Sequence, residues 1–352
     1  MSISKILAAL LIMGTATANA ADIGGITVNG EVAFDYNFLS SKDAAIPNTE
    51  GATNEAYRLN KAQVLLKKET EQISFLGRLV HTPTQYSPDG AATSKAYFGV
   101  LDQMELFYKV NPQLQIGFGR FLTTMGYESL MRYENAFYND TIAYQTIVPG
   151  YGEGLRAKYT PGDWLTATLS TYNQFTYGAI GEDYAPTKTT ELSVTGVLAG
   201  KLTWFAGYLI GTDAAVAPAT GKKDNSASSV WASYKFMDNL MLAVTYDSRT
   251  FKFENTHTHW ADSVSAVLTY GIGINNLGLR YEMVRGGNEI GYGGAADKVN
   301  ALSVTDKIVL NDNLNLYAEF RMDHSDADSF LDKDGAPTAD AQMVTLGALA
   351  HF

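Results

Sequence analysis

The sequence predicts an all-β fold, a transmembrane antiparallel β-barrel of about 16 strands. Three observations lead to this prediction: strand-length segments alternate apolar with polar residues, the connections between them alternate between short and long, and the last segment ends in an aromatic residue, Phe352. A helix would need apolar residues at steps of three and four, which these segments lack. No apolar run of 18 residues follows residue 20, so no transmembrane helix is predicted.

The composition excludes several classes of protein. The chain has 352 residues, of which 46% are hydrophobic and 18% charged, and this balance argues against disorder. The 26 Lys and Arg against 37 Asp and Glu argue against nucleic acid as a partner, because phosphate binding needs a basic face. With no Cys, the chain cannot form disulfides, a catalytic thiolate or a Cys-ligated metal site.

The first twenty residues have the features of a signal peptide. Lys5 supplies the positive charge, residues 6–13 form a short apolar run, and Ala18-Asn19-Ala20 fits a cleavage site. We therefore expect a signal peptide at residues 1–20, cleaved after Ala20, and a single barrel at residues 21–352. Losing Lys5 takes the formal net charge from −11 to −12.

The strand pattern is clear in several segments. Residues 240–249 place Leu240, Leu242, Val244 and Tyr246 on one face and Thr245, Asp247 and Arg249 on the other, and segments 263–270, 277–283 and 314–323 repeat this alternation. The pattern breaks near residues 58–63 and 117–120, where the register is ambiguous. Tyr108, Tyr159, Trp204, Tyr234, Phe236, Tyr246 and Tyr270 fall on the outward register, as expected of the aromatic girdles of a membrane barrel.

The connections between these segments distinguish a membrane barrel from a soluble sandwich. Short turns are expected at 69–72, 111–113, 160–163, 199–201, 237–239, 273–276 and 311–313, and all but the first contain Gly, Pro, Asn or Asp. Long polar loops are expected near 41–54, 84–95, 123–150, 176–188, 212–226, 251–260, 286–298 and 324–340. Seven turns and eight loops give sixteen strands with both termini on one side, as bacterial barrels require.

A barrel of this size has a water-filled lumen, so its inward residues should be polar. Both signs of charge occur there, which would create a transverse field, although any one pair, such as Glu319 with Arg321, could simply be a salt bridge within the wall. The predicted pore wall comprises Glu105, Arg120, Arg156, Lys158, Asp247, Arg249, Arg280, Glu282, Glu319, Arg321 and Asp323, with Gln103, Lys109 and Glu191 on the same register.

The longest loop, 123–150, is the third external loop, and it is rich in aromatic residues that need burial. We expect it to fold into the barrel and to place Glu128, Arg132, Glu134 or Asp140 at a pore constriction. The alternative is a packed lid outside the barrel.

The sequence gives only weak indications of catalytic or metal-binding residues. His257-Thr-His259 could contribute two metal ligands but lacks a third. His324 stands beside Asp323 and Ser325, but adjacent side chains on a strand point to opposite faces, so His324 faces away from both. The Asp-rich segment 326–340 fails the EF-hand pattern and is interpreted as a solvated acidic loop. No metal site, cofactor or enzymatic activity is therefore predicted.

Several stretches resemble the OmpL-like family of β-barrel porins of Gram-negative outer membranes. The resemblance lies in Gly119-Arg-Phe121, Gly126-Tyr-Glu128, Asn135, Tyr138, Pro149 and Gly154-Leu-Arg-Ala-Lys-Tyr159, covers about residues 55–175, and extends more loosely to the last forty residues. It implies a passive diffusion channel without a cofactor, and porins of this kind are frequently homotrimers. Family members often carry a Ser-rich motif and a later His where this chain has Asn139-Asp-Thr-Ile and Tyr151, so the resemblance does not indicate the solute.

The last strand places Val344, Leu346, Ala348, Ala350 and Phe352 on one face and resembles the C-terminal signal that outer-membrane barrels present to the β-barrel assembly machinery. The expected surroundings are outer-membrane lipid and lipopolysaccharide.

We expect a porin for small hydrophilic solutes and ions, with a mild cation preference that follows from the acidic balance. One alternative is a saccharide-specific channel that uses Tyr127, Tyr133, Phe137, Tyr138 and Tyr144 as stacking rings; a barrel hydrolase is a further one.

Overall fold

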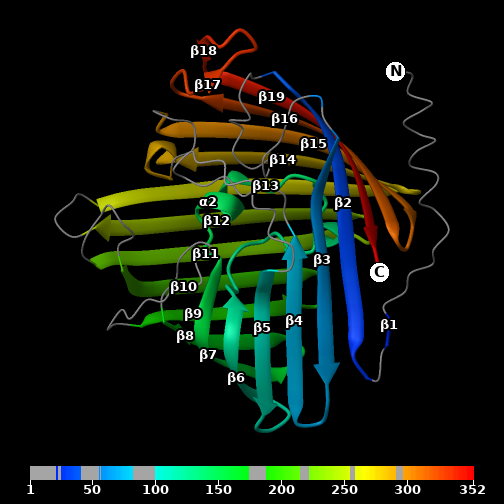
Figure 1. Cartoon of the computed structure of the whole chain (residues 1–352), viewed down its shortest axis with the longest axis vertical. Helices are drawn as coiled ribbons and strands as arrows, with labels where there is room; N and C mark the ends of the chain where they lie inside the picture. The colour runs from blue at the N-terminus through cyan, green and yellow to red at the C-terminus, as the bar shows by residue number, and fades with distance from the viewer. Residues whose placement is uncertain are drawn as a thin grey trace.

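The computed structural model describes residues 21–22, 25–40, 55, 57–81, 100–173, 188–214, 222–253, 258–290 and 296–352. Within these ranges sixteen long antiparallel strands each pair with the next along the chain, and the last of them, β19, pairs with the first, β2. The sheet therefore closes into a barrel (Figure 1), and the predicted fold class is confirmed. The predicted signal peptide lies outside the described residues.

The strands differ in length, and three very short ones lie outside the barrel set. Strand β1 (Ala21–Asp22) pairs with the start of β2, and β17 (Phe330–Leu331) pairs with β18 (Pro337–Thr338). The sixteen barrel strands are β2 (Thr27–Leu39), β3 (Tyr57–Glu69), β4 (Ile73–His81), β5 (Val100–Lys109), β6 (Leu114–Leu122), β7 (Tyr151–Gly162), β8 (Leu165–Tyr172), β9 (Thr189–Leu198), β10 (Leu202–Ala214), β11 (Lys222–Met237), β12 (Leu240–Phe253), β13 (Thr258–Ile272), β14 (Asn275–Arg285), β15 (Lys298–Asn311), β16 (Leu314–Ser325) and β19 (Asp340–His351).

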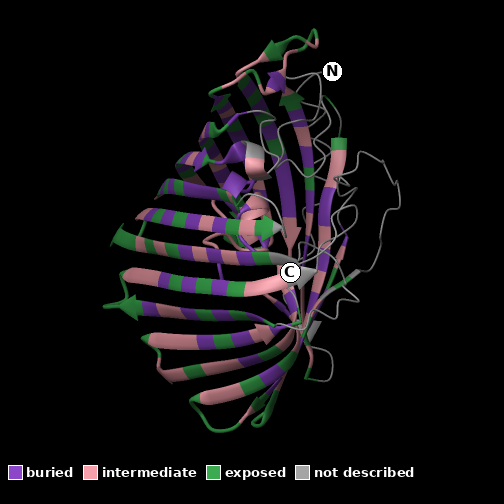
Figure 2. Ribbon diagram, turned by 90° about the vertical axis from the view of Figure 1, so that its left-hand side faces the viewer, coloured by how far each residue is buried: buried purple, intermediate pink, exposed green. Residues whose placement is uncertain are grey.

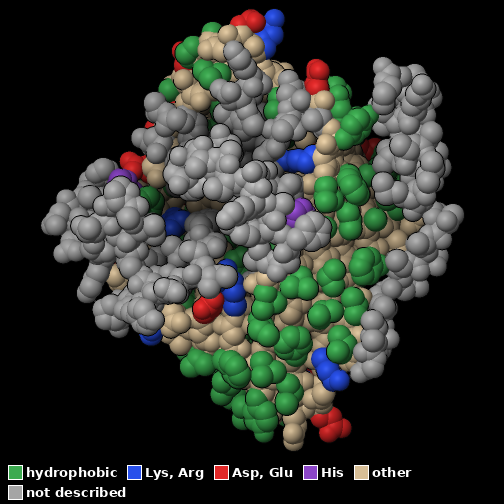
Figure 3. Space-filling model, viewed as in Figure 1, with side chains coloured by type: hydrophobic (Ala, Val, Ile, Leu, Met, Phe, Trp, Pro, Cys, Tyr) green, Lys and Arg blue, Asp and Glu red, His purple; other side chains and the backbone are tan. Residues whose placement is uncertain are grey.

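Burial follows the alternation in the sequence, so that each strand is banded in Figure 2. In β12, Val244 is 48% and Tyr246 39% exposed, whereas Thr245 and Asp247 are buried. The exposed apolar side chains form the outer surface, and Figure 3 shows them gathered over the face that β2 to β5 present. An apolar outer band with a polar interior is the arrangement that a lipid bilayer requires of a barrel.

The short connections lie where they were predicted, but the turns at 160–163 and 273–276 are shorter than expected, the latter because β14 begins at Asn275. Strand β7 continues through Gly162, so the turn narrows to residues 163–164, and a bulge lies between Tyr159 and Gly162. Strands β10 to β13 are longer than expected, which shortens the predicted loops 212–226 and 251–260. Loops 41–54 and 84–95, most of 176–188 and part of 286–298 lie outside the described residues.

The two segments whose alternation breaks have local causes. Between β2 and β3 the pairing passes from Ala33 with Lys61 to Phe34 with Leu59, so Asn60 is the extra residue of a β-bulge. In β6, Gly119 has a φ of +150°, and an added Cβ would collide with the carbonyl oxygen of Met104. Glycine allows this close approach of two strands.

The helices of the described residues are short. They are α2 (Ile142–Thr146) and the 3₁₀ turns η1 (Arg132–Glu134) and η2 (Gly287–Ile290). None of the helices in these ranges has the length and apolar character needed to cross a membrane.

Candidate functional site

Residues 123–150, between β6 and β7, run along the inside of the barrel. Figure 1 shows α2 within the ring of strands, and hydrogen bonds join this segment, the inner loop, to β2, β9, β14 and β16. Several of its apolar side chains are fully buried against the wall, among them Tyr138, Ile142 and Ile147 at 0% exposure. Burying these side chains stabilises the loop inside the barrel.

Two buried glutamates of the wall hold one half of the inner loop. Glu282 accepts the N–H groups of Ile142 and Ala143, each at 2.8 Å, which are the first two donors of α2. Glu319 accepts the N–H of Tyr138 at 2.7 Å and that of Asn139 at 3.3 Å. Hydrogen bonds from backbone N–H groups to carboxylates are stronger than those to neutral acceptors, and a carboxylate suits the start of a helix.

Two further buried glutamates hold the other parts of the loop. Glu31 of β2 accepts the N–H of Arg132 at 3.1 Å and that of Tyr133 at 3.3 Å. Glu191 of β9 accepts the N–H of Thr124 at 2.7 Å. The four wall glutamates are the main polar anchors of the loop backbone. Because the donors on the loop are buried with them, losing an anchor would leave unsatisfied polar groups.

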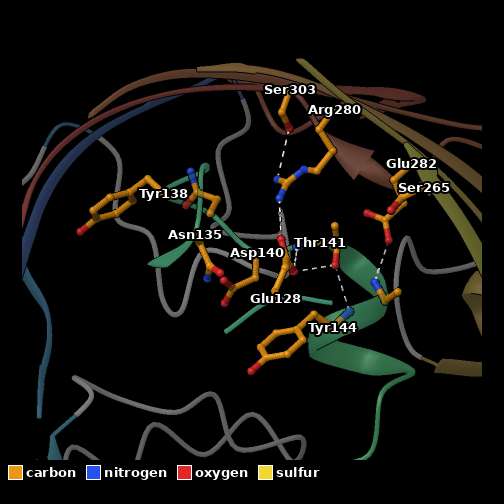
Figure 4. Close-up of polar contacts among 12 residues, drawn as sticks. Glu128, Asn135, Tyr138, Asp140, Thr141, Tyr144, Ser265, Arg280, Glu282 and Ser303 are labelled. Carbon is orange, nitrogen blue, oxygen red and sulfur yellow. Dashed lines mark hydrogen bonds and ion pairs between the residues drawn. The ribbon is translucent and has the colours of Figure 1, made fainter. Parts of the chain in front are cut away.

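Arginines from the wall provide a second set of contacts, and Figure 4 shows that between Arg280 and Glu128. The guanidinium of Arg280 donates to Glu128 at 2.8 Å and lies over the ring of Phe137 at 4.4 Å. Arg321 donates to the carbonyl oxygen of Asp140 at 3.0 Å and is itself held by two hydrogen bonds to Asp323. Both arginines therefore connect the barrel wall to the inner loop.

Glu128 is the most unusual carboxyl of the loop. It accepts hydrogen bonds from the N–H of Thr141 at 2.8 Å and from its hydroxyl at 2.7 Å. Burial raises the pKa of the Glu128 carboxyl to about 7, although Arg280 and the Thr141 hydrogen bonds act in the opposite direction. Its charge therefore changes near neutral pH.

The four residues expected at the constriction occupy different environments. Glu128 is in contact with Arg280, whereas Arg132 is buried and its guanidinium donates to the carbonyl oxygen of Tyr138. Glu134 is exposed in the lumen and accepts from the hydroxyl of Ser129 at 2.5 Å. Asp140 is buried and accepts from Gln145 at 3.0 Å.

Most residues expected on the pore wall lie on inward registers. Arg156 donates to Ser170 and Tyr172, Lys158 lies over the ring of Phe107, and Glu105 accepts from Gln103 at 2.6 Å. The buried members of the expected set are Glu105, Arg156, Asp247, Arg249, Arg280, Glu282, Glu319, Arg321 and Asp323.

Arg120 does not share that register. It pairs with Met104 on one side and with Glu153 on the other, and Met104 is 46% exposed on the outer face. Its guanidinium lies 3.4 Å from Glu153 and 5.1 Å from the ring centre of Tyr151. Arg120 shares the register of Ile116 and Phe118, which are 47% and 60% exposed, whereas Phe121 at 0% exposure lies on the inward register.

Two cavities flank the inner loop. The larger, of about 350 Å³, lies between the loop and β12 to β15, and the smaller, of about 230 Å³, lies on the side of β3 to β6. Glu128 and Ser129 line both. The larger cavity also contains Tyr127, Glu134, Asn135, Ala136, Phe137, Thr141, Tyr144, Val148, Met241, Thr245, Asp247, Ser265, Val267, Thr269, Asn276 and Lys307.

Of the five rings considered for stacking a sugar, three line this cavity: Tyr127, Phe137 and Tyr144. The other two are engaged elsewhere. Tyr133 stacks on His351 with ring centres 4.3 Å apart, and Tyr138 packs edge-on against Tyr317.

The candidate enzymatic groups are not brought together. His324 bonds to Asp340 at 2.8 Å, whereas the neighbouring Asp323 bonds to Arg321 on the inner face. His259 stacks on Phe251 and contacts Glu289, while His257 lies outside the described residues. Within the described ranges, no group of three or more His, Cys, Asp or Glu side chains could hold a metal ion.

Sequence reasoning missed Glu31, Lys61 and Lys307 as contacts of the inner loop. Lys61 donates to the carbonyl oxygen of Leu130 at 2.8 Å, and Lys307 to that of Asn135 at 3.1 Å. The alternation that identified the other inward residues also applies to Glu31, because Glu31 lies on the same inward face as Ala33 and Asp35.

Comparison with known proteins agrees with this geometry. The sequence matches the family described as "Putative beta-barrel porin-2, OmpL-like" over residues 12–352. The chain belongs to this porin family. A channel in the outer membrane is therefore the general role of this OmpL-like porin, and the resemblance seen in its sequence is confirmed. No curated protein matches the chain.

Solved outer-membrane proteins share the fold of this porin at low sequence identity. OmpT of Vibrio cholerae is 18% identical, with a TM-score of 0.63, over 95% of this chain and 100% of its own. The outer-membrane channel DcaP of Acinetobacter baumannii is 14% identical, with a TM-score of 0.64, over 95% and 100%. The anion-selective porin from Comamonas acidovorans is 15% identical, with a TM-score of 0.65, over 93% and 99%.

Proposed function

We propose that this porin allows small hydrophilic solutes and ions to diffuse passively through a lumen that the inner loop narrows. The observation that carries the proposal is the loop itself, which buried wall glutamates hold across the interior beside two cavities. A loop held in this way restricts the size of solutes and lets the side chains beside it select among them.

The charges beside the larger cavity favour a mild preference for cations. Glu128, Glu134 and Asp247 line it, whereas Lys307 is the cation among its lining residues and donates to carbonyl oxygens of the loop. Carboxylates that line a passage raise the local concentration of cations. The Comamonas porin is named anion-selective, but its likeness to this chain extends to the fold alone.

Reversal potentials in an asymmetric KCl gradient test the proposal. Refolded protein in a planar bilayer should show discrete conductance steps and a potential of the sign that potassium permeation produces. Anion selectivity would contradict the proposed preference. The absence of conductance from correctly folded barrels would contradict the channel function itself.

We further propose cleavage after Ala20, delivery to the assembly machinery through the C-terminal strand ending in Phe352, and residence in lipopolysaccharide-containing membrane. A V. cholerae OmpT structure is described as a trimer form, and we propose the same assembly here. Conductance steps that occur in threes would support it, and independent single steps would oppose it.

A saccharide channel is the second candidate, because Tyr127, Phe137 and Tyr144 line the same cavity as a row of wall hydroxyls. Concentration-dependent block of the current by a sugar would favour it over a general pore. We do not propose enzymatic activity, since the histidines of the described residues are dispersed in the structure.

A further inference from the structure

Asp247 stands on the inner face of β12, beside the larger cavity, and is only 4% exposed. Its neighbours across the two strand pairs are Ser229 and Ser263. One carboxylate oxygen, Oδ1, has no hydrogen-bond partner among the described residues. A buried carboxylate oxygen without a donor is costly, so this position favours a ligand that supplies a donor and a positive charge.

The other carboxylates of this wall are used differently. Glu282 and Glu319 each accept two backbone N–H groups of the inner loop, and Asp323 receives the guanidinium of Arg321. These groups hold the loop in place. Asp247 faces the cavity without such a bond on Oδ1, so its role is separable from the anchoring of the loop.

The cavity next to Asp247 is apolar on the side of the loop. Tyr127 and Phe137 line it, together with Met241 and Val267 of the wall. The ring of Tyr127 is fixed by edge-on packing against Trp231, with ring centres 5.4 Å apart. Aromatic faces attract organic cations as well as apolar groups.

The remaining charges of the cavity oppose an anionic ligand. Glu134 lines it and is exposed, and Glu128 lies at its edge in contact with Arg280. Lys307 is directed to the loop, where its ammonium donates to the carbonyl oxygens of Tyr133 and Asn135. An anion in this cavity would be repelled by Asp247 and Glu134, and Lys307, the one cation among the described residues that line the cavity, is bonded to the loop instead.

We infer that this cavity is a binding site for small organic cations, in which an ammonium group donates to Asp247 and an apolar or aromatic body packs against Tyr127 and Phe137. The inference rests on the proposed channel function, since the solute reaches the cavity along the lumen. A volume of about 350 Å³ suits an arylalkylamine, and the hydroxyls of Thr245 and Ser265 lie on the same wall.

The test is single-channel recording of the refolded full-length barrel with three probes. We expect 2-phenylethylammonium to interrupt the current in a concentration-dependent way. Its neutral counterpart 2-phenylethanol and the small cation methylammonium should each act at least about tenfold more weakly, because each lacks one of the two contacts. Equal block by the alcohol would overturn the role of the charge, and equal block by methylammonium would overturn the role of the apolar cavity.

The variant Asp247→Asn should weaken block by 2-phenylethylammonium about tenfold to a hundredfold, because a hydrogen bond to a charged group is lost. Asp334→Asn removes the same charge from an exposed loop, with a side chain 75% exposed, and should leave block unchanged. Equal effects of the two variants would overturn the inference. Open channels without amine-specific block would overturn it while leaving the channel function standing, whereas folded barrels that never conduct would refute the channel function itself.

Discussion

Arg280 of β14 donates a hydrogen bond of 2.8 Å to Glu128 of the inner loop, and their side chains are 2% and 10% exposed. The contact joins residues 152 positions apart in the chain. Because Glu128 lines both cavities, the pair contributes both to the position of the loop and to the charge beside the passage.

Replacing Arg280 by Met should destabilise the barrel by about 3–5 kcal/mol, because breaking a buried ion pair leaves Glu128 uncompensated. The double variant Arg280→Met with Glu128→Gln should be less destabilised than Arg280→Met alone, because Glu128 no longer contributes an uncompensated charge. Urea unfolding in detergent or lipid measures both. Strictly additive effects of the two substitutions would show that the contact contributes nothing.

The raised pKa of Glu128, about 7 against an ordinary value of 4.5, predicts a pH dependence. Because folding raises this pKa, protonation of Glu128 favours the folded state. This contribution to the free energy of unfolding is fully present below about pH 4.5 and is lost as pH rises through about 7. Between these values stability should fall by about 1.4 kcal/mol per pH unit relative to Glu128→Gln. Unfolding curves at pH 5 and pH 8 measure this, and identical pH profiles for the two proteins would contradict it.

The same ionisation should alter ion selectivity. As pH falls from 8 to 6, protonation of Glu128 removes one negative charge from the edge of both cavities, so the preference for cations should weaken. Reversal potentials at the two pH values report the change. In Glu128→Gln the shift should be much smaller; a shift as large as in the unmodified protein would assign the effect to other groups.

Removing a wall anchor should loosen the inner loop. Glu319→Ala leaves the N–H groups of Tyr138 and Asn139 without their acceptor, and we expect a loss of about 2–5 kcal/mol in stability. Limited proteolysis should then cut within residues 123–150 while the strands stay protected. Glu153→Gln changes a carboxylate on β7 that is 41% exposed and serves as the control; equal protection of the loop in both variants would argue against the anchoring role.

Gly347 of β19 allows the inner loop to approach the last strand. A Cβ added there would lie 2.5 Å from the ring of Tyr138, so Gly347→Ala should cost about 1–3 kcal/mol and lower the temperature of heat-induced unfolding. Gly150→Ala is the matched control, because no atom lies within 4 Å of its added Cβ. If both variants unfold at the same temperature, close packing of Tyr138 against Gly347 of the last strand is refuted.

The sequence by itself determined the barrel. Alternation in segments such as 240–249, together with turn residues between paired segments, specified strands, faces and their number, because the side-chain period of a strand is fixed at two residues. The alternation was insufficient where a bulge adds a residue, as at Asn60, or where a glycine lets strands approach, as at Gly119. Arg120 was expected on the pore wall, although its register is that of the exposed Phe118.

Only the tertiary structure decided how the inner loop is held. Nothing local in the sequence indicates that Glu319 accepts the backbone of Tyr138, or that Glu31 in the first strand accepts the backbone of Arg132, 101 residues later. Such pairs depend on the closure of the barrel, which brings distant strands around one lumen. The sequence therefore shows which residues face inward and are polar. The closed barrel decides which partner each charged side chain has, and it leaves one carboxylate oxygen of Asp247 without a hydrogen bond among the described residues.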